Sequence, residues 1–252
     1  MFSDLTDKRV LITGSTAGIG LATAALFARH GAKVGINGLR SEPPAEIATF
    51  PGECAFFSAD LSRSAGCEAL VEAFVARFGG IDILINNAGG LGGRNGLEAI
   101  DDAFFDRVMD LNCRSALMVT KFAIPHLRAS ARENGTTASV ISTGSIAARE
   151  GGIGAGLYAS AKAWLHNIHR NWVKEFTQDN IRFNIVSPGS IDTAFHHGKS
   201  DEVLGKMRAS IPMGRFGRSE EVAPTYLFLA SHNCSGYITG QIIDVNGGQL
   251  AP

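Results

Sequence analysis

The sequence has few charged residues and almost no net charge. Lys, Arg, Asp and Glu make up 19% of its 252 residues, and the formal net charge is -1. No cluster of Lys or Arg could follow a phosphate backbone, so we expect no nucleic-acid partner. No apolar run approaches the length of a membrane span, and the first residues carry acids where a signal peptide needs basic residues. We therefore expect a cytoplasmic protein with no membrane partner.

Cysteine is scarce as well, and no cysteine pair has the C-x-x-C spacing of a zinc site. The adjacent histidines His196 and His197 lack the i,i+4 spacing with which two ligands share one helix face. We expect neither a disulfide framework nor a metal site. The four cysteines are Cys54, Cys67, Cys113 and Cys234.

Apolar runs of strand length alternate with longer helical patterns along the whole chain. This alternation is typical of a parallel sheet covered by helices on both faces. No repeat and no Pro/Ser-rich linker divides the chain, so we expect one domain over residues 1–252, a Rossmann-type, doubly wound α/β fold with seven parallel strands. The expected strands are Arg9–Thr13, Lys33–Asn37, Cys54–Ser58, Ile81–Asn86, Ala138–Ser142, Arg182–Ser187 and Gln241–Val245.

Helices are expected between these strands, two of them with an internal proline. Pro125 and Pro224 each remove a backbone donor, so we expect a kink or a delayed start in their helices. Residues 190–218 are rich in glycine and show little periodicity, which predicts a mobile flap over a site. The expected helices are Ile19–His30, Ser64–Phe78, Ala103–Ser130, Leu157–Thr177 and Glu220–Ala230.

A glycine-rich turn follows the first expected strand and opens directly into a helical pattern. Its spacing is G-x-x-x-G-x-G, with Gly14, Gly18 and Gly20, and it differs from the G-x-G-x-x-G dinucleotide fingerprint. A lone glycine cluster is as well explained by an ordinary strand-to-helix turn. Its position at the first strand and first helix favours a nucleotide site, where free N–H groups bind a pyrophosphate.

Tyr158 and Lys162 stand four residues apart in a helical pattern, so they share one helix face. Without context such a pair is usually a surface tyrosine and a solvated lysine. Ser145 follows the fifth expected strand, 13 positions before Tyr158, and Asn112 lies within the preceding helix. Ser142 and Thr143 are near competitors for any role given to Ser145.

These residues together resemble the short-chain dehydrogenase/reductase family from Thr13 to Gly248. The similarity is greatest to 3-oxoacyl-[acyl-carrier-protein] reductases and related sugar or polyol dehydrogenases, and the sequence does not decide between them. The resemblance implies that Asn112, Ser145, Tyr158 and Lys162 are catalytic. It also implies a homotetramer, with the third and fourth long helices packed against partner copies. The implied cofactor contacts are Gly14, Ser15, Thr16, Gly18, Ile19, Gly20, Asp60, Leu61, Asn87, Ala88, Gly89, Tyr158, Lys162, Pro188, Gly189 and Thr193.

The chemistry of hydride transfer explains why these residue types are needed. Hydride addition to a carbonyl leaves an alkoxide, which needs hydrogen-bond donors and then a proton. Tyr158 is expected to be the general acid or base, and Ser145 to position the substrate oxygen. A free phenol has a pKa of about 10, and we expect the nearby Lys162 ammonium to lower it. Asn112, by resemblance, supports Lys162 through a water.

The residue that selects between NAD and NADP should follow the second strand. Gly38 stands where NAD-preferring relatives carry an acid, and Arg40 follows two residues later. We therefore favour NADP(H), with NAD(H) as the alternative. NADP-preferring relatives often place the arginine at the position of Leu39, so the alternative role of Arg40 is a solvated loop charge.

The expected function is hydride transfer between NADP(H) or NAD(H) and a carbonyl or secondary alcohol. One alternative is a nucleotide-binding regulatory protein without turnover, and another is a nucleotide-sugar epimerase or dehydratase. A serine hydrolase is disfavoured because Ser145 is not in a G-x-S-x-G elbow. The substrate pocket is expected to be mainly apolar, lined by residues 90–96 and 151–157 together with Phe195, His196, Met207 and Met213.

Overall fold

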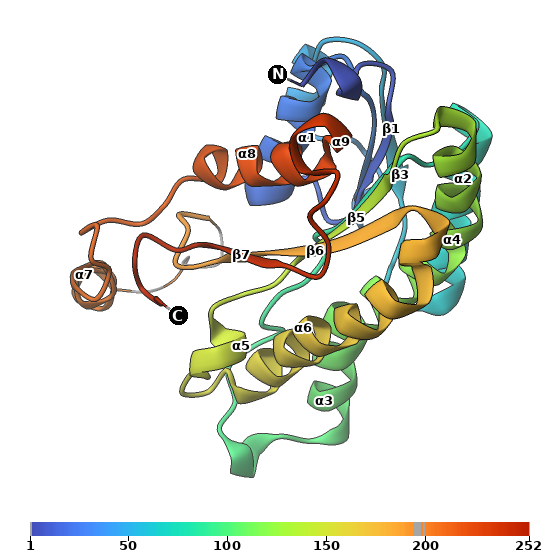
Figure 1. The fold of residues 1–252 in the computed structure, drawn as a ribbon. Helices are drawn as coiled ribbons and strands as arrows, with labels where there is room; N and C mark the ends of the chain where they lie inside the picture. Colours follow the sequence, from blue (N-terminus) through green and yellow to red (C-terminus); the bar gives the residue numbers. More distant parts are fainter. Residues whose placement is uncertain (1, 194–197, 199, 252) are drawn as a thin grey trace.

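The computed structural model describes residues 2–193, 198 and 200–251 and contains a single seven-stranded sheet. All neighbouring strands are parallel, in the order β3-β2-β1-β4-β5-β6-β7. The fold is the expected single-domain, Rossmann-type α/β arrangement (Figure 1). The strands are β1 Arg9–Ile12, β2 Lys33–Gly38, β3 Cys54–Ser58, β4 Ile83–Asn86, β5 Ala138–Thr143, β6 Ile181–Pro188 and β7 Ile242–Val245.

The long helices cover both faces of the sheet. One apolar layer joins Val10 and Ile12 of β1 to α1 and α8, and the other joins Leu11 of the same strand to α2, α4 and α6. The alternation follows from the period of two along a strand. These helices are α1 Gly18–Arg29, α2 Ser64–Phe78, α4 Ser115–Asn134, α6 Gly156–Phe176 and α8 Ser219–Ala230 (Figure 1).

The expected strands and helices are all present, and most ends shift by one or two residues. The main correction concerns Ala103–Ser130, which was expected to be one helix. The structure has α3 Asp102–Met109, a π-helical turn η4 at Asp110–Arg114, and then α4. A π turn is a rare single-turn bulge inside a helical region, and the helical pattern of the sequence did not distinguish it from a continuous helix. Helix α4 continues through Pro125, and α8 contains Pro224.

The expected flap at residues 190–218 contains a helix that the sequence did not predict. Helix α7 Asp201–Ala209 lies within it, and the side chain of its N-cap Ser200 accepts a hydrogen bond from the Val203 backbone N–H. The helix has no buried residue, so its sequence lacks the apolar stripe that indicates a helix packed on a core. Phe195, His196 and His197 lie outside the described residues.

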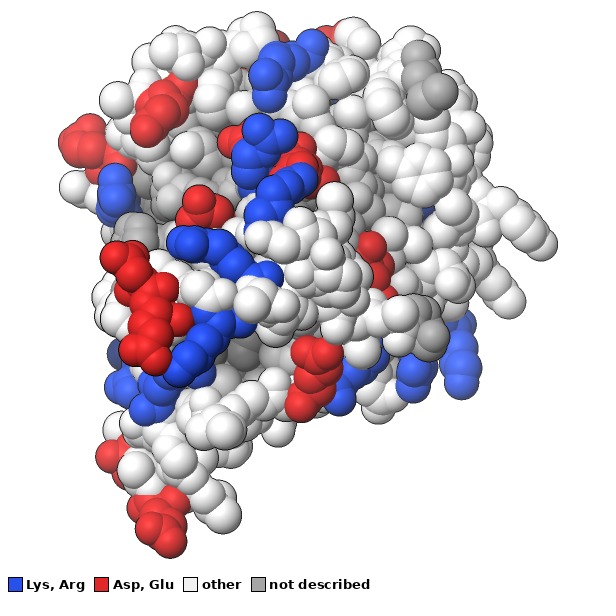
Figure 2. Space-filling view, turned by 90° about the vertical axis from the view of Figure 1, so that its left-hand side faces the viewer, with Lys and Arg blue, Asp and Glu red and all other residues white. Residues whose placement is uncertain are grey.

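The shorter elements and the surface complete the description. They are the helices α5 Ala147–Glu150 and α9 His232–Ser235 and the 3-10 helices η1 Ser3–Leu5, η2 Ala45–Thr49, η3 Leu97–Ala99 and η5 Thr177–Asp179. Figure 2 shows basic and acidic side chains beside one another on the face that carries α7. Among the described helices, none is long and apolar enough to cross a membrane, and the same residues hold no cluster of metal-binding side chains.

Candidate active site

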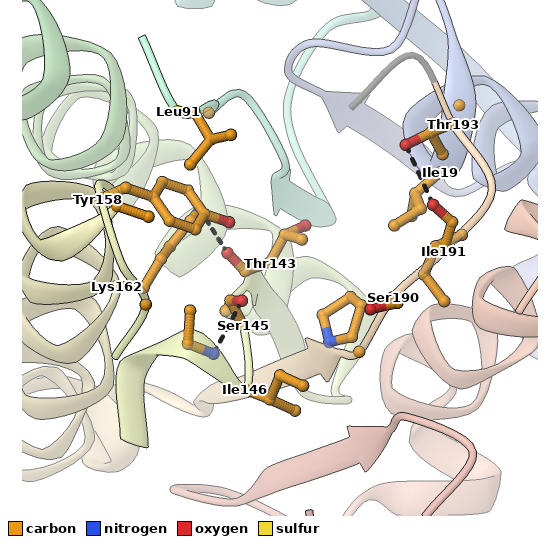
Figure 3. A pocket seen from close by; sticks show the side chains of 18 of the residues that line it. Ile19, Leu91, Thr143, Ser145, Ile146, Tyr158, Lys162, Ser190, Ile191 and Thr193 are labelled. Carbon is orange, nitrogen blue, oxygen red and sulfur yellow. Dashed lines mark hydrogen bonds between the residues drawn. The ribbon is translucent and has the colours of Figure 1, made fainter. Parts of the chain in front are cut away.

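A cavity of about 470 Å³ opens at the carboxyl ends of the central strands. It lies between the chain segments that follow β1, β4, β5 and β6, at the point where the strand order reverses. In open α/β sheets, ligands bind at this point. Figure 3 shows Ser145, Tyr158 and Lys162 on one side of the cavity and Ile19 and Thr193 on the other.

The glycine turn forms one wall of the cavity, and its glycines are required by its shape. Gly14 and Gly18 have positive φ angles of 58° and 54°. A Cβ on Gly14 would lie 2.7 Å from the Cα of Ala88, and one on Gly20 would lie 2.6 Å from the carbonyl oxygen of Gly14. The backbone can therefore come close to a ligand only because these positions have no side chain.

The N-terminus of α1 faces the same cavity without a side-chain cap. Ala17 is its N-cap residue, and its methyl group cannot accept a hydrogen bond from the first turn. Ala17, Gly18, Ile19 and Gly20 all line the cavity. Their free N–H groups and the helix dipole suit a pyrophosphate, so this wall fits the dinucleotide expected from the sequence.

Two polar side chains fix the turn against β4. The Thr13 hydroxyl accepts hydrogen bonds from the backbone N–H groups of Asn87 and Ala88 at 2.9 and 3.0 Å. The Asn87 amide donates to the carbonyl oxygens of Thr13 and Gly14 at 3.1 and 2.8 Å. The segment after β4 thereby holds the glycine turn in place, which explains why both sequence signatures are needed.

The structure distinguishes Ser145 from its two competitors. Ser142 is fully buried and its Oγ lies 2.8 Å from Nε2 of His169. The Thr143 hydroxyl is bonded to Asn87 and to Tyr226 at 3.1 and 2.7 Å. Ser145 lines the cavity and is hydrogen-bonded to the phenol of Tyr158, so it is the hydroxyl of the three that meets Tyr158.

Tyr158 and Lys162 project from one face of α6 into the cavity (Figure 3). Lys162 is 3% exposed, and its Nζ donates to the Thr143 carbonyl oxygen at 2.8 Å. The same Nζ lies 5.7 Å from the centre of the Tyr158 ring. Burial lowers the pKa of the Lys162 ammonium to about 8.

The expectation that Lys162 lowers the pKa of Tyr158 is wrong for this structure. Burial raises the pKa of the phenol, and the hydrogen bond with Ser145 opposes this only in part. The Lys162 ammonium is itself desolvated and donates to the Thr143 carbonyl oxygen. Desolvation of the phenolate is therefore the larger effect.

Asn112 lies in the π turn η4 and is 1% exposed. Its amide donates to the carbonyl oxygens of Gly90 and Val108, both at 2.8 Å, and its Oδ1 accepts from the Gly90 N–H at 3.1 Å. A Cβ on Gly89 would lie 2.8 Å from Asn112 Oδ1 and 3.0 Å from Lys162 Nζ. Asn112 therefore ties the segment after β4 to η4, beside Lys162.

The remaining expected cofactor residues fall into two groups. Asn87, Ala88, Gly89, Pro188, Gly189 and Thr193 line the cavity, but Ser15, Thr16, Asp60, Leu61 and Arg40 do not. The Ser15 hydroxyl is buried and bonded to the backbone of Ile12 and Asn37 at 2.6 and 3.0 Å. Asp60 accepts hydrogen bonds from Ser62, and Leu61 is buried in the core.

The sequence predicted only some of the residues that line the cavity. Among the residues expected from the pocket loops, Leu91, Arg94 and Met207 line it, but Met213 does not and is 64% exposed. The side chain of Gln249 comes from the C-terminal tail and accepts a hydrogen bond from the Ser190 N–H at 2.6 Å. No local pattern indicates this long-range contact. The other residues that were missed include Ile146 and Glu150, whereas Ser190 and Ile191 belong to the expected flap.

The fold and the site together define an NAD(P)-dependent oxidoreductase. A family model described as Enoyl-(Acyl carrier protein) reductase matches residues 14–249. The chain is 35% identical to the 3-oxoacyl-[acyl-carrier-protein] reductase FabG of Chlamydia muridarum (strain MoPn / Nigg), over 98% of this chain and 99% of that protein. The chain belongs to the short-chain dehydrogenase/reductase family.

Two solved structures are similar over nearly their whole length. The NADH-dependent reductase A1-R' responsible for alginate metabolism is 63% identical, with a TM-score of 0.91 and coverage of 99% of this chain and 100% of that one. The RhlG/NADP active-site complex of Pseudomonas aeruginosa is 34% identical, with a TM-score of 0.91 and coverage of 99% and 98%. These relatives support a nicotinamide cofactor but not the preference for NADP(H) expected from the sequence.

Proposed function

We propose that this enzyme is an NADH-dependent reductase of a carbonyl compound derived from alginate, with Tyr158 as proton donor. The observation that carries the proposal is the hydrogen-bonded pair Ser145 and Tyr158 above the buried Lys162, beside the glycine turn. The substrate class rests on the 63% identical relative, which is described both as a DEH reductase and as responsible for alginate metabolism.

The proposed roles follow from this geometry. A bound dihydronicotinamide supplies the hydride that reaches the carbonyl carbon. Ser145 and Tyr158 are hydrogen-bonded to each other in the wall of the cavity, so a substrate oxygen beside both hydroxyl groups accepts hydrogen bonds from both. Tyr158 then transfers its phenolic proton to this oxygen, which completes the alcohol, and the phenolate regains a proton from solvent. Because burial raises the pKa of Tyr158, the phenol stays protonated at neutral pH, which suits the direction of reduction.

Lys162 and Asn112 act behind the reacting atoms. The Lys162 ammonium lies 5.7 Å from the centre of the Tyr158 ring and donates to the Thr143 carbonyl oxygen, which holds it at the cavity. It is also placed to donate to the nicotinamide ribose, as the family resemblance implies. Asn112 keeps Gly89 and Gly90 against Lys162, so that the wall of the cofactor site and the ammonium keep a fixed separation.

The proposed preference for NADH rests on the end of β2. A side chain on Gly38 would collide with the methyl group of Thr16, so the missing acid at this position follows from packing and does not itself select a cofactor. Arg40 is exposed and does not line the described cavity, which favours its role as a solvated loop charge. The 63% identical relative is described as NADH-dependent and as complexed with NAD.

Tyr158→Phe tests the assignment. We expect kcat for carbonyl reduction to fall by roughly 10² to 10⁴, while the Kd for NADH, measured by fluorescence titration, changes less than about twofold. Tyr237→Phe is the matched control, because Tyr237 is fully exposed. Retention of more than a tenth of the wild-type kcat would refute the role of Tyr158.

Steady-state KM values for NADH and NADPH test the cofactor. We expect a lower KM for NADH, and Arg40→Gln should leave that value unchanged. A lower KM for NADPH that rises in Arg40→Gln would show that Arg40 binds the 2′-phosphate and would restore the NADP(H) preference.

Three further expectations remain predictions: the homotetramer, the cytoplasmic location and the mobility of residues 190–218. The tetramer is supported by the exposed apolar side chains Phe105 on α3 and Leu117 on α4. Light scattering measures the assembly directly. A monomer at micromolar concentration would refute it.

A further inference from the structure

Two glycine-rich loops meet at the mouth of the cavity. One follows β4 and contains Leu91 and Arg94, and the other connects α5 to α6 over residues 151–155. Arg94 Nη1 donates to the Ile153 carbonyl oxygen at 3.1 Å, and the backbone N–H of Asn95 donates to the Gly154 carbonyl oxygen at 3.1 Å. Arg94 is exposed, but these two hydrogen bonds hold its side chain at the cavity.

Charge is rare in the lining of this cavity. Its described lining includes three charged side chains, Arg94, Glu150 and Lys162. Lys162 is buried and belongs to the catalytic group, so Arg94 is the cation left for another ligand group. Arg94 and Glu150 form no ion pair within the described part of the chain.

The guanidinium of Arg94 keeps most of its hydrogen-bonding capacity. It has five N–H donors in a planar fork, and one nitrogen is engaged with Ile153. The fork matches a carboxylate, which accepts two parallel hydrogen bonds. A guanidinium whose position is already fixed by the loops loses less conformational freedom on binding. The Glu150 carboxylate, on the other hand, repels an anion from its own part of the mouth.

We propose that Arg94 binds a carboxylate of the substrate and thereby makes the enzyme selective for anionic carbonyl compounds. The inference deepens the proposed function and rests on it for the choice of compound. Alginate is a polymer of uronic acids, so compounds derived from it carry the carboxylate that this site selects. A neutral carbonyl compound leaves the guanidinium without a charged partner.

The test compares each acid with its own methyl ester, because the ester removes the charge and keeps the carbonyl. The pairs are the monomeric uronate fraction of enzymatically depolymerised alginate with its methyl ester, and 4-oxopentanoate with its methyl ester. Each compound is assayed as a substrate with NADH and as a competitive inhibitor of a neutral carbonyl substrate. Wild-type enzyme should show a lower KM or Ki for the acid than for the ester.

The variants are Arg94→Gln, Arg94→Lys and the control Arg29→Gln, in which an exposed arginine on α1 is changed away from the cavity. Arg94→Gln should raise KM or Ki for the acid roughly 10- to 100-fold and should change the value for the ester much less. Arg94→Lys keeps the charge but loses the fork, so it should restore part of the affinity. Arg29→Gln should behave as the wild type.

The outcomes separate the two hypotheses. If Arg94→Gln weakens acid and ester equally, Arg94 only ties the two loops together and the inference is overturned. An unchanged ratio of acid to ester overturns it as well. If Arg94 controls the 4-oxopentanoate pair but the wild type does not reduce the uronate fraction, the Arg94 site stands and the alginate-derived substrate falls.

Discussion

Both ends of the parallel sheet bury charged side chains, but only the amino end pairs its buried charge with an opposite charge among the described residues. At the amino end, Arg9 Nε and Nη2 donate to the two carboxylate oxygens of Asp82 at 2.8 and 2.9 Å, and Ser130 and Asn134 donate to the same carboxylate. At the carboxyl end, Lys162 bonds to a neutral carbonyl oxygen. No acid lies within ion-pair distance of Lys162 among the described residues.

The pKa values show the consequence of this difference. Burial alone would raise the pKa of Asp82, but the hydrogen bonds from Arg9 and Ser130 outweigh it and hold that pKa below its ordinary value. The pKa of Lys162 is lowered to about 8 because burial is not compensated. The amino end therefore stabilises the fold, while the carboxyl end keeps an uncompensated charge ready for a ligand.

Lys162→Met gives the largest expected effect. We expect kcat to fall by roughly 10² to 10⁴ without loss of folding stability, since a buried cation is replaced by an apolar chain of similar length. The pKa of Lys162 lies below its unfolded value, so wild-type stability should rise with pH between about 8 and 10.5, and the variant should lack this rise. Urea unfolding at pH 7 and 9.5 measures it, with exposed Lys174→Met as the control.

Asp82→Asn should lower folding stability and leave kcat unchanged, the reverse of Lys162→Met. The variant leaves Arg9 without its carboxylate partner, and we expect the unfolding free energy to fall by about 2 to 4 kcal/mol, less than for a fully buried pair because Arg9 is partly exposed. Its kcat should match the wild type. Asp106→Asn, an exposed position on α3, is the control. A large loss of kcat in folded Asp82→Asn would contradict the claim that the amino end of the sheet serves stability and the carboxyl end serves catalysis.

At low pH, folding stability should fall because of two buried histidines, His166 and His169, which lie on the same face of α6 as Lys162. Burial lowers the pKa of His166 to about 4 and that of His169 to about 3. The unfolded chain therefore binds protons first, and stability should fall as the pH drops from about 6.5 to 4, by on the order of 2 to 3 kcal/mol per histidine.

His169→Gln should make this decline shallower, and half-buried His126→Gln should not. Unfolding free energies measured every half pH unit provide the comparison. An identical pH dependence in wild type and His169→Gln would exclude His169 as a cause.

Alanine substitutions at two helical glycines have the smallest expected effect. They test whether the backbone at the carboxyl end of the sheet needs a glycine to bind the cofactor. Gly20→Ala places a methyl group against the Asn87 amide and the Gly14 carbonyl, so NADH affinity should fall at least roughly tenfold. Gly205→Ala on α7 meets open space and should raise stability by about 0.5 to 1 kcal/mol. Equal NADH affinity in the two variants would contradict the role of the glycine turn in binding the cofactor.

The sequence alone determined the layers and most of the site. Strand-length apolar runs and helical patterns follow local periodicity, so the sequence predicts all seven strands and the five main helical regions. Tyr158 and Lys162 share a helix face by spacing, and the glycine turn is recognisable because its φ angles exclude other residues. These are properties of short segments.

Tertiary structure decided what depends on contacts between distant segments. Ser145 differs from Ser142 and Thr143 only through partners on other elements, His169, Asn87 and Tyr226. Gln249 and Glu150 reach the cavity from segments with no motif, and the π turn at Asn112 interrupts a segment that the sequence predicts as one helix. The pKa of Tyr158 is set by desolvation, which is a property of the folded packing and cannot be read from spacing.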